Sequence, residues 1–349
     1  MGCEDLDVVI RVDREQVLAY RVARQGLHRA NTPVDDLDVV NLGVQDTPLA
    51  SARQSFGART DASVDDHSLV RVWALRASPY LHHASDLPKL AAALWRDSNE
   101  LRQAAEAFRA VITGPMVKGA ASAAVTRAVP KALVKYCRGC QAAHIFESLF
   151  RQAALPAGIR LDLDSSPPVL VPIDDWPGVP VEQTGTDELI RLYLTFVGPA
   201  GHADVAAWLD TTQREVRAVW PKGLVEVDVD GRTAWLPESE VDLLRDPPEP
   251  PRVRLLPTSD PFLQERNRPM LVPDKTRHKE MWPVIGQPGA VLVDGDVAGI
   301  WRPKATKKRL ELRITQFLPV PRDARKELQA EATRLGELRG IPETTVQWN

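Results

Sequence analysis

The sequence has few cysteines and no long apolar run, and we expect no signal peptide. Its three cysteines, Cys3, Cys137 and Cys140, are too few for a disulfide framework and agree with a reducing compartment. Arg, Asp or Pro interrupts every aliphatic run before it reaches the roughly 20 apolar residues that a membrane-spanning helix needs. Glu4 and Asp5 make the N-terminus acidic where a signal peptide is basic. We therefore expect a cytoplasmic protein.

The chain also lacks a strong net charge. Its formal charge of -3 and pI near 6.2 exclude long-range attraction to phosphate as a property of the whole molecule, so any nucleic-acid binding must come from local patches. The 44% of hydrophobic and 26% of charged residues are ordinary for a globular protein, and 349 residues indicate two to four modules.

Cys137, Cys140 and His144 are the residues to consider for a metal. On a helix they would share one face and offer three ligands. Structural zinc needs a fourth ligand, and the chain has no second cysteine pair to supply it. We therefore predict no metal and no cofactor, and the alternative interpretation of these positions is a half-buried helix face.

The first part of the chain alternates helical and extended patterns. Residues 13–30 place apolar residues at helical spacing, with Asp13 as N-cap and Gln16 three positions later. A second helix is expected from Thr32-Pro33 and a short strand at 70–73. This order favours a small winged-helix unit at 1–97.

The rest of the chain divides at proline-rich segments. Breaks at glycine and proline predict three helices within 98–156, and the prolines of 164–185 indicate a linker that closes a unit at 98–185. Three helices and a hairpin about Asp230-Gly231 then follow in the order of a winged helix, which predicts a third such unit at 186–250. A mostly β domain at 251–349, with strands at 253–256, 290–293, 298–301 and 310–314 and a closing helix at 322–339, completes the chain.

The densest positive charge lies in residues 301–309, at an expected hairpin tip. A basic loop on a near-neutral protein is typical of phosphate contacts that position a duplex without reading its sequence. A solubilising loop is the alternative interpretation of this segment. Basic residues also occur between 118 and 138, where the alternative to a binding surface is a solvated face.

One short polar triplet stands out between apolar segments. Gln45, Asp46 and Thr47 bring an amide, a carboxylate and a hydroxyl together after the aliphatic stretch 37–42, and such groups can hold and activate a water molecule. The alternative is an Asx-type turn or a helix cap ahead of Pro48.

Several segments together resemble the AlkZ-like winged-helix DNA glycosylases over nearly the whole chain. The segments are VLAYRVARQGL at 17–27, GVQ at 43–45, RVWALR at 71–76, residues 256–263, VLVDG at 291–295 and GIWR at 299–302. The resemblance implies an α+β fold with three tandem winged-helix motifs and a C-terminal β-barrel-like domain, together forming a C-shaped channel for duplex DNA. It also implies excision of alkylated bases, in some members bulky adducts or interstrand crosslinks.

The resemblance also indicates site residues. The family signature is Gln, an apolar residue and a second Gln, with Asp in the last position in a sister branch. Here the catalytic candidates read Gln45, Asp46 and Thr47, so only the first Gln is kept, and Tyr80 stands where many members have His. The expected DNA-binding residues are Arg71, Arg76, His82, His83, Arg266, Arg268, Arg302, Lys304, Lys307, Lys308 and Arg309.

The chemistry agrees with this interpretation. Hydrolysis of an N-glycosidic bond passes through a cationic sugar, which a carboxylate stabilises while a polar side chain orients water. An alkylated purine already carries positive charge and leaves readily, so no metal or redox cofactor is required. We expect a monomeric enzyme that acts on double-stranded DNA carrying alkylated bases. The alternatives are a non-catalytic winged-helix DNA-binding protein or transcriptional regulator, and an enzyme acting on another nucleic acid.

Overall fold

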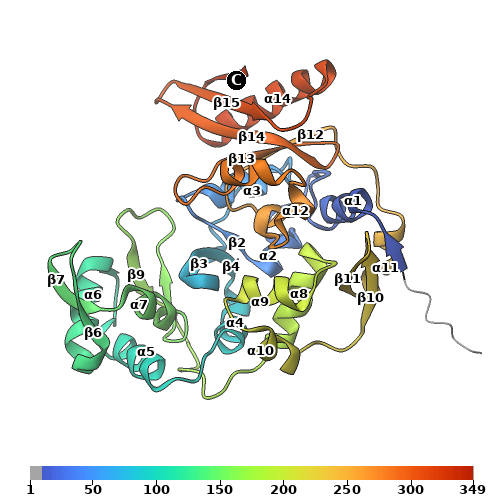
Figure 1. Cartoon of the computed structure of the whole chain (residues 1–349). Helices are drawn as coiled ribbons and strands as arrows, with labels where there is room; N and C mark the ends of the chain where they lie inside the picture. Colours follow the sequence, from blue (N-terminus) through green and yellow to red (C-terminus); the bar gives the residue numbers. More distant parts are fainter. Residues whose placement is uncertain (1–9, 349) are drawn as a thin grey trace, which may run out of the picture. The chain divides into compact units, whose positions relative to one another are not determined.

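The structure is a computed structural model that describes residues 10–348 (Figure 1). Cys3 and the expected absence of a signal peptide lie outside these residues. The chain forms two compact units, each built from separate segments. The first comprises the described part of Met1–Thr32 with Gln54–Val64 and Ile190–Asn349, and the second comprises Pro33–Arg53 and Asp65–Leu189. The four units predicted from the sequence divide the chain differently and stay a prediction.

Helices and a small sheet occupy the first half of the first unit. Helix α1 begins after Asp13, whose side chain accepts a hydrogen bond from the Gln16 backbone N–H at 2.8 Å, as predicted. The three-stranded sheet has the order β1-β10-β11, with the predicted turn at Asp230-Gly231. The elements are α1 (Arg14–Arg24), α8 (Thr186–Val197, which begins in the second unit), α9 (His202–Leu209), α10 (Gln213–Ala218), α11 (Val241–Arg245), β1 (Ile10–Val12), β10 (Leu224–Val229) and β11 (Arg232–Pro237).

An open five-stranded, half-barrel sheet forms the C-terminal part of this unit. Its order is β12-β13-β14-β15-β16, and helix α14 packs on one face through Ala324, Leu328, Ala332 and Leu335. The strands and the closing helix confirm the sequence prediction, to which the structure adds β16. The elements are β12 (Val253–Leu256), α12 (Arg268–Leu271), α13 (His278–Met281), β13 (Gly289–Val293), β14 (Asp296–Ala305), β15 (Arg309–Gln316), α14 (Arg322–Leu338) and β16 (Glu343–Trp348).

A six-stranded sheet of order β2-β4-β3-β8-β9-β5 organises the second unit. Its strands are β2 (Val44–Gln45), β3 (Leu69–Trp73), β4 (Pro79–His83), β5 (Met116–Val117), β8 (Ile159–Leu161) and β9 (Val169–Pro172). The helices are α2 (Val39–Leu42), α3 (Ser51–Gly57, which ends in the first unit), α4 (Leu87–Ala93), α5 (Asn99–Val111), α6 (Lys118–Ala128) and α7 (Glu147–Ala154). Phe108 and Phe150 pack with their ring centroids 4.7 Å apart in the core that α5 and α7 share.

Two local predictions for this unit need correction. The helix expected from Thr32-Pro33 is a 3-10 turn at Val34–Asp36 followed by the single-turn α2, because Gly43 at φ +86° ends it. Residues 98–156 contain the three predicted helices, but a separate hairpin, β6 (Val134–Cys137) and β7 (Ala142–Ile145), lies between α6 and α7. Only its base, at Leu133 and Ile145, is buried, so the segment has no apolar face that would hold a helix against the core.

No helix among residues 10–348 is long and apolar enough to cross a membrane, as the interrupted aliphatic runs predicted.

A fully buried ion pair joins three segments of the first unit. Both side chains of Arg59 and Asp260 have no exposed surface, and two hydrogen bonds of 2.8 Å link them. The remaining donors of Arg59 reach the backbone carbonyl and side chain of Gln25 and the carbonyl of Ser55, so all five N–H groups are used.

We predict that Asp260→Asn lowers the free energy of unfolding by about 3 to 5 kcal/mol, because it leaves a buried guanidinium without its counter-charge. Urea denaturation measures the change. Asp323→Asn is the matched control, since it removes one carboxylate of the exposed Arg252–Asp323 pair, whose 2.8 Å contact is open to solvent. Equal midpoints for the two variants would contradict the role of the Arg59–Asp260 pair.

Candidate active site

The short edge strand β2 positions the polar triplet. Val44 pairs with Leu81 and Gln45 with Tyr80, and the Asp46 N–H extends the ladder to the carbonyl of Pro79 at 2.9 Å. Gly43 allows the chain to enter this strand, because its positive φ suits glycine and the His82 ring lies against it. A Cβ at this position would lie 2.2 to 2.9 Å from ring atoms of His82.

Strand alternation places Gln45 and Asp46 on opposite faces of the sheet. The pairings put Gln45, Tyr80 and His82 on one face and Asp46, Arg71 and Trp73 on the other. Gln45 and Asp46 are therefore adjacent in the sequence but do not face the same space.

Asp46 is buried and paired with Arg71. Only 4% of Asp46 is exposed, its Oδ2 lies 2.9 Å from Arg71 Nε, and its Oδ1 accepts a hydrogen bond from the Ala52 N–H at 3.2 Å. The Nε atom is close to the carboxylate without the alignment of a hydrogen bond, and Nη1 of Arg71 is also buried without a hydrogen-bond partner. The contact is therefore chiefly an attraction of charges.

Burial disfavours the charged forms of both Asp46 and Arg71, as the directions of their pKa shifts show. Burial raises the pKa of the Asp46 carboxyl above its usual range, while the Arg71 charge and the Ala52 N–H oppose the shift. Burial also lowers the pKa of Arg71, against the attraction of Asp46. The Asp46 carboxylate thus loses its charge at a higher pH than an exposed aspartate does.

The opposite face carries a neutral network. Tyr80 donates its hydroxyl to Oε1 of the half-buried Gln45 at 3.2 Å. His82 lies beside Tyr80, with ring centroids 6.1 Å apart, and its Nε2 is buried without a hydrogen-bond partner. Burial lowers the pKa of His82 to about 4, and the nearby His83 adds to this shift, so the ring is uncharged at neutral pH.

A pocket of about 270 Å³ opens on the face that carries Asp46. Asp46, Thr47 and Arg71 line it, whereas Gln45 does not. The walls add apolar and cationic side chains, namely Leu49, Trp73, Pro79, Leu161, Pro168, Lys118 and Arg151. The Arg151 guanidinium lies 5.6 Å from the Trp73 ring centroid, and Glu147 Oε1 accepts from both Lys118 and Arg151 at 2.7 Å.

Lys118, Arg151 and Trp73 were not among the site residues predicted from the sequence. They come from α6, α7 and β3, and their residue types alone do not distinguish them from solvated cations or a core aromatic residue. Their place in the pocket depends on the pairing of β3 with β8 at Arg71 and Leu161, which no local pattern predicts.

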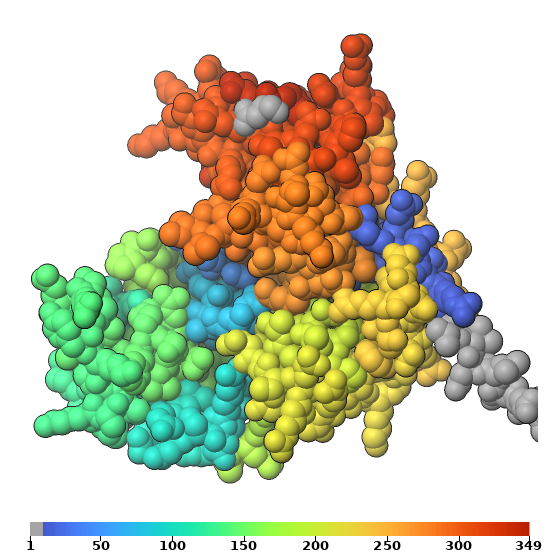
Figure 2. Space-filling model, viewed as in Figure 1, coloured from blue at the N-terminus to red at the C-terminus, as the bar shows by residue number. Residues whose placement is uncertain are grey.

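The predicted DNA contacts divide by exposure. Arg71 and His82 are only 5% and 3% exposed, and their role as DNA contacts stays a prediction. The fold uses Arg71 to pair Asp46 and packs His82 on Gly43. Arg76, His83 and Arg266 are half-exposed, and Arg268 is exposed above the Trp282 ring. The exposed residues of the β14–β15 hairpin, which Figure 2 shows at the surface of its unit, are Arg302, Lys304, Lys307, Lys308 and Arg309.

Comparison with known proteins identifies the family. The sequence model of the DNA glycosylase AlkZ-like family matches residues 43–338. The chain belongs to the AlkZ-like DNA glycosylases. This match begins at Gly43, two residues before Gln45, and confirms both the resemblance seen in the sequence and the expectation of an enzyme that acts on DNA.

A solved structure agrees on the fold of this glycosylase. The DNA glycosylase AlkZ of Streptomyces sahachiroi superimposes with a TM-score of 0.78 over 97% of this chain and 100% of that chain, at 18% identity. At this identity the likeness shows a shared α+β fold alone. No curated protein matches the sequence.

We predict that Gly43→Ala destabilises this glycosylase by about 1 to 3 kcal/mol, since alanine at φ +86° is strained and its methyl group would overlap His82. Thermal or urea unfolding tests this. Gly119→Ala is the control, because Gly119 lies in α6 with nothing within 4 Å and should tolerate alanine or gain from it. A neutral Gly43→Ala would show that the contact with His82 does not set the path of β2.

Proposed function

We propose that this glycosylase hydrolyses the N-glycosidic bond of an alkylated purine in duplex DNA and that Asp46 stabilises the sugar cation. One observation carries the proposal: a buried carboxylate, paired with a guanidinium, lines a pocket that also has cationic and aromatic walls. The family match supports the reaction class, and the arrangement around Asp46 supports this substrate class and this residue.

The electrostatics of the pocket suit a reaction that develops positive charge. An alkylated purine leaves as a neutral base, and the sugar becomes cationic as the bond breaks. A carboxylate in a site of low polarity stabilises such a cation more strongly than one in water. Arg71 favours the ionised form of Asp46 despite its burial, so Arg71 acts as a positioning residue in this proposal.

The proposed roles of the triplet follow from the two faces of the sheet. The Thr47 hydroxyl lies on the same pocket as Asp46 and is exposed, so Thr47 supplies the group that orients the attacking water. Gln45 is held by Tyr80 on the other face of an edge strand, where it supports the strand or contacts DNA that extends past the edge. Lys118 and Arg151 at the pocket supply positive charge for flanking phosphates.

The size of the pocket bears on the lesion. Its volume of about 270 Å³ lies below the roughly 300 to 1,000 Å³ of ordinary ligand pockets. It accommodates a sugar or another small group. A bulky N7-guanine adduct or a crosslink would have to remain outside it, with no need for the whole lesion to enter the protein.

The winged-helix motifs and the DNA channel belong to the same proposal. The order α5, β5, α6, α7, β8, β9, with β9 pairing both β5 and β8, supports a winged-helix motif within 98–185. The helices α8 to α10 followed by the β10–β11 hairpin support another within 186–250. The winged-helix motif predicted at 1–97, the DNA channel and the monomeric state stay predictions of the family resemblance.

We predict that Asp46→Asn lowers excision of N7-methylguanine from a duplex by about 10- to 1000-fold, while duplex affinity changes little. Strand scission at the abasic product, under single-turnover conditions, measures the rate. Asp66→Asn is the matched control, because Asp66 is also a buried carboxylate paired with an arginine, Arg53 at 3.0 Å, but does not line the pocket. Both variants are assayed at a temperature at which each is folded.

The pH dependence of the parent enzyme tests the same role without a mutation. Because the ionised form is the active one and burial raises the pKa of Asp46, catalysed excision should fall as pH decreases through a pKa above the usual aspartate value. Parental excision by Asp46→Asn would overturn the assignment. Binding without excision of any alkylated duplex would favour the non-catalytic DNA-binding alternative.

We also predict that the tip of the β14–β15 hairpin contacts phosphate. Replacing Lys307 and Lys308 together by Gln should weaken duplex binding and reduce the slope of log affinity against log salt by up to about 1.8, which corresponds to two phosphates. Fluorescence anisotropy at several salt concentrations measures the slope. The control replaces Arg322 and Lys326, two exposed cations of α14, by Gln. Equal slopes for the two double variants would show that the tip only adds charge to the surface.

A further inference from the structure

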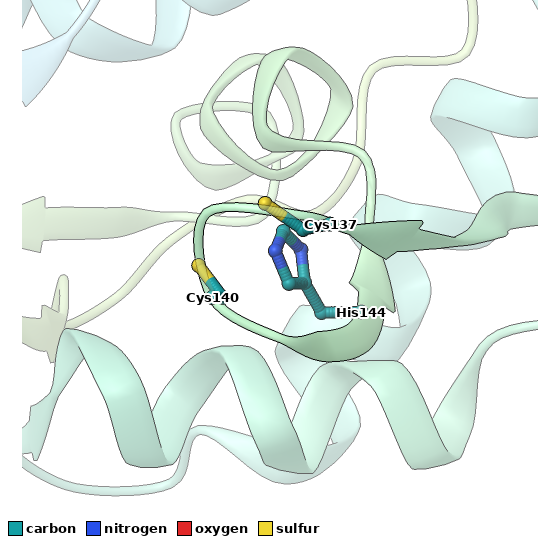
Figure 3. Close-up of side chains that lie close together, drawn as sticks. All are labelled: Cys137, Cys140 and His144. Atoms are coloured by element: carbon teal, nitrogen blue, oxygen red, sulfur yellow. The ribbon is translucent and has the colours of Figure 1, made fainter.

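The hairpin between α6 and α7 brings two cysteines and a histidine together. Cys137 ends β6, Cys140 lies in the turn and His144 lies on β7, where it pairs with Lys135. One potential ligand atom of each residue lies within 4.8 Å of those of the other two. Figure 3 shows the three side chains close together at the turn. This replaces the helical arrangement considered from the sequence, in which the three residues would only share a face.

The histidine is oriented as a metal ligand is. Its Nδ1 lies 2.6 Å from the backbone carbonyl of Ile145, a contact in which Nδ1 carries the proton and donates it. The other ring nitrogen, Nε2, then has its lone pair available for a cation. Most histidines that bind metals donate their other ring N–H to a carboxylate, a backbone carbonyl or a water molecule, which fixes the ring and its tautomer. This is a second observation, independent of the clustering of the side chains.

The donor set selects the kind of metal. Two thiolates and one imidazole suit zinc, which binds sulfur at about 2.3 Å and nitrogen at about 2.0 Å in tetrahedral geometry. Such bond lengths place neighbouring donor atoms roughly 3.5 to 3.8 Å apart. The three atoms of the hairpin lie within 4.8 Å of one another, which exceeds the required spacing by at most about 1.3 Å, and rotation of exposed side chains in a turn can close that gap.

We propose that the hairpin tip binds one Zn²⁺ through Cys137 Sγ, Cys140 Sγ and His144 Nε2, with the fourth position open to solvent or to an added ligand. Among the residues that the structure describes, this cluster contains these three metal donors and no fourth. Glu147, three residues after His144, already accepts from Lys118 and Arg151 at 2.7 Å, so it is not counted. Cys140 is exposed and Cys137 is half-exposed, which leaves one side of the site open.

The metal would have a structural effect on a hairpin with little core of its own. β6 and β7 form a separate two-stranded sheet, and such sheets are marginally stable in water. Tyr136 is 67% exposed and Ala142 and Ala143 are exposed, so packing secures only the base at Ile145. A zinc ion would hold the tip together where apolar contacts do not.

The experiment measures zinc in the whole chain, purified under reducing conditions without chelator. Elemental analysis after dialysis should find about one zinc per parent chain, and about one in Cys3→Ser, the control that removes the remaining cysteine. Cys137→Ser, Cys140→Ser and His144→Asn should each fall to background after the same dialysis. Cobalt(II) added to the metal-free parent should give thiolate-to-metal charge-transfer bands, and these should be missing from the three variants.

Hydrogen exchange gives a local measurement. Exchange of amides in residues 134–145 should slow on addition of zinc to the metal-free parent and stay unchanged in Cys140→Ser. The proposal is overturned if the parent binds no zinc in a titration, or if the three variants retain it. A Cys137–Cys140 disulfide, found by mass spectrometry in protein purified under reducing conditions, would also overturn the proposal. Loss of zinc from Cys3→Ser would show that Cys3 is the fourth ligand and would overturn the proposal of an open fourth position.

Discussion

The structure depends on arginine side chains that the fold buries, each of which must have a carboxylate beside it. Arg59 pairs with Asp260, Arg21 with Glu265 at 2.6 Å, and Arg71 with Asp46. Removing a guanidinium from water is expensive, and a paired carboxylate together with backbone acceptors makes it tolerable. Arg59 has all five donors satisfied, so its pair fixes the segments that meet there. The pairs therefore constrain which segments can come together.

The Asp46–Arg71 pair differs from the Arg59–Asp260 pair in a way that bears on catalysis. Arg71 has buried donors without hydrogen-bond partners, and Asp46 lines a pocket rather than a closed core. The carboxylate is consequently less stabilised in its charged form than that of Asp260 is by its bidentate contact. A site that is incompletely satisfied before substrate binds can gain more from a developing cation than a fully satisfied one.

Periodic patterns predicted α1, the β10–β11 hairpin and most strands of the C-terminal sheet, because they record which face of an element is buried. The α1 cap at Asp13 and the strands at 253–256 and 290–293 follow from local patterns of capping and burial. The β6–β7 hairpin and β16 are short or largely exposed, so their residues carry little periodic signal. The pocket was less predictable. Lys118 and Arg151 line the pocket because strands that are distant in the sequence pair with one another. No local pattern around these two residues indicates that pairing.

The polar triplet shows that a sequence motif does not by itself define an active site. Family membership follows from the sequence around residues 43–338, whereas catalysis requires that side chains reach the same small volume. In extended backbone Gln45 and Asp46 point to opposite faces, and of the three triplet residues Asp46 and Thr47 line the pocket while Gln45 does not. Positions one and two residues after the Gln therefore share one pocket, although the Gln itself does not line it. If the chemistry takes place in this pocket, the second and third residues of the triplet perform it, and the Gln stabilises the edge strand that presents them.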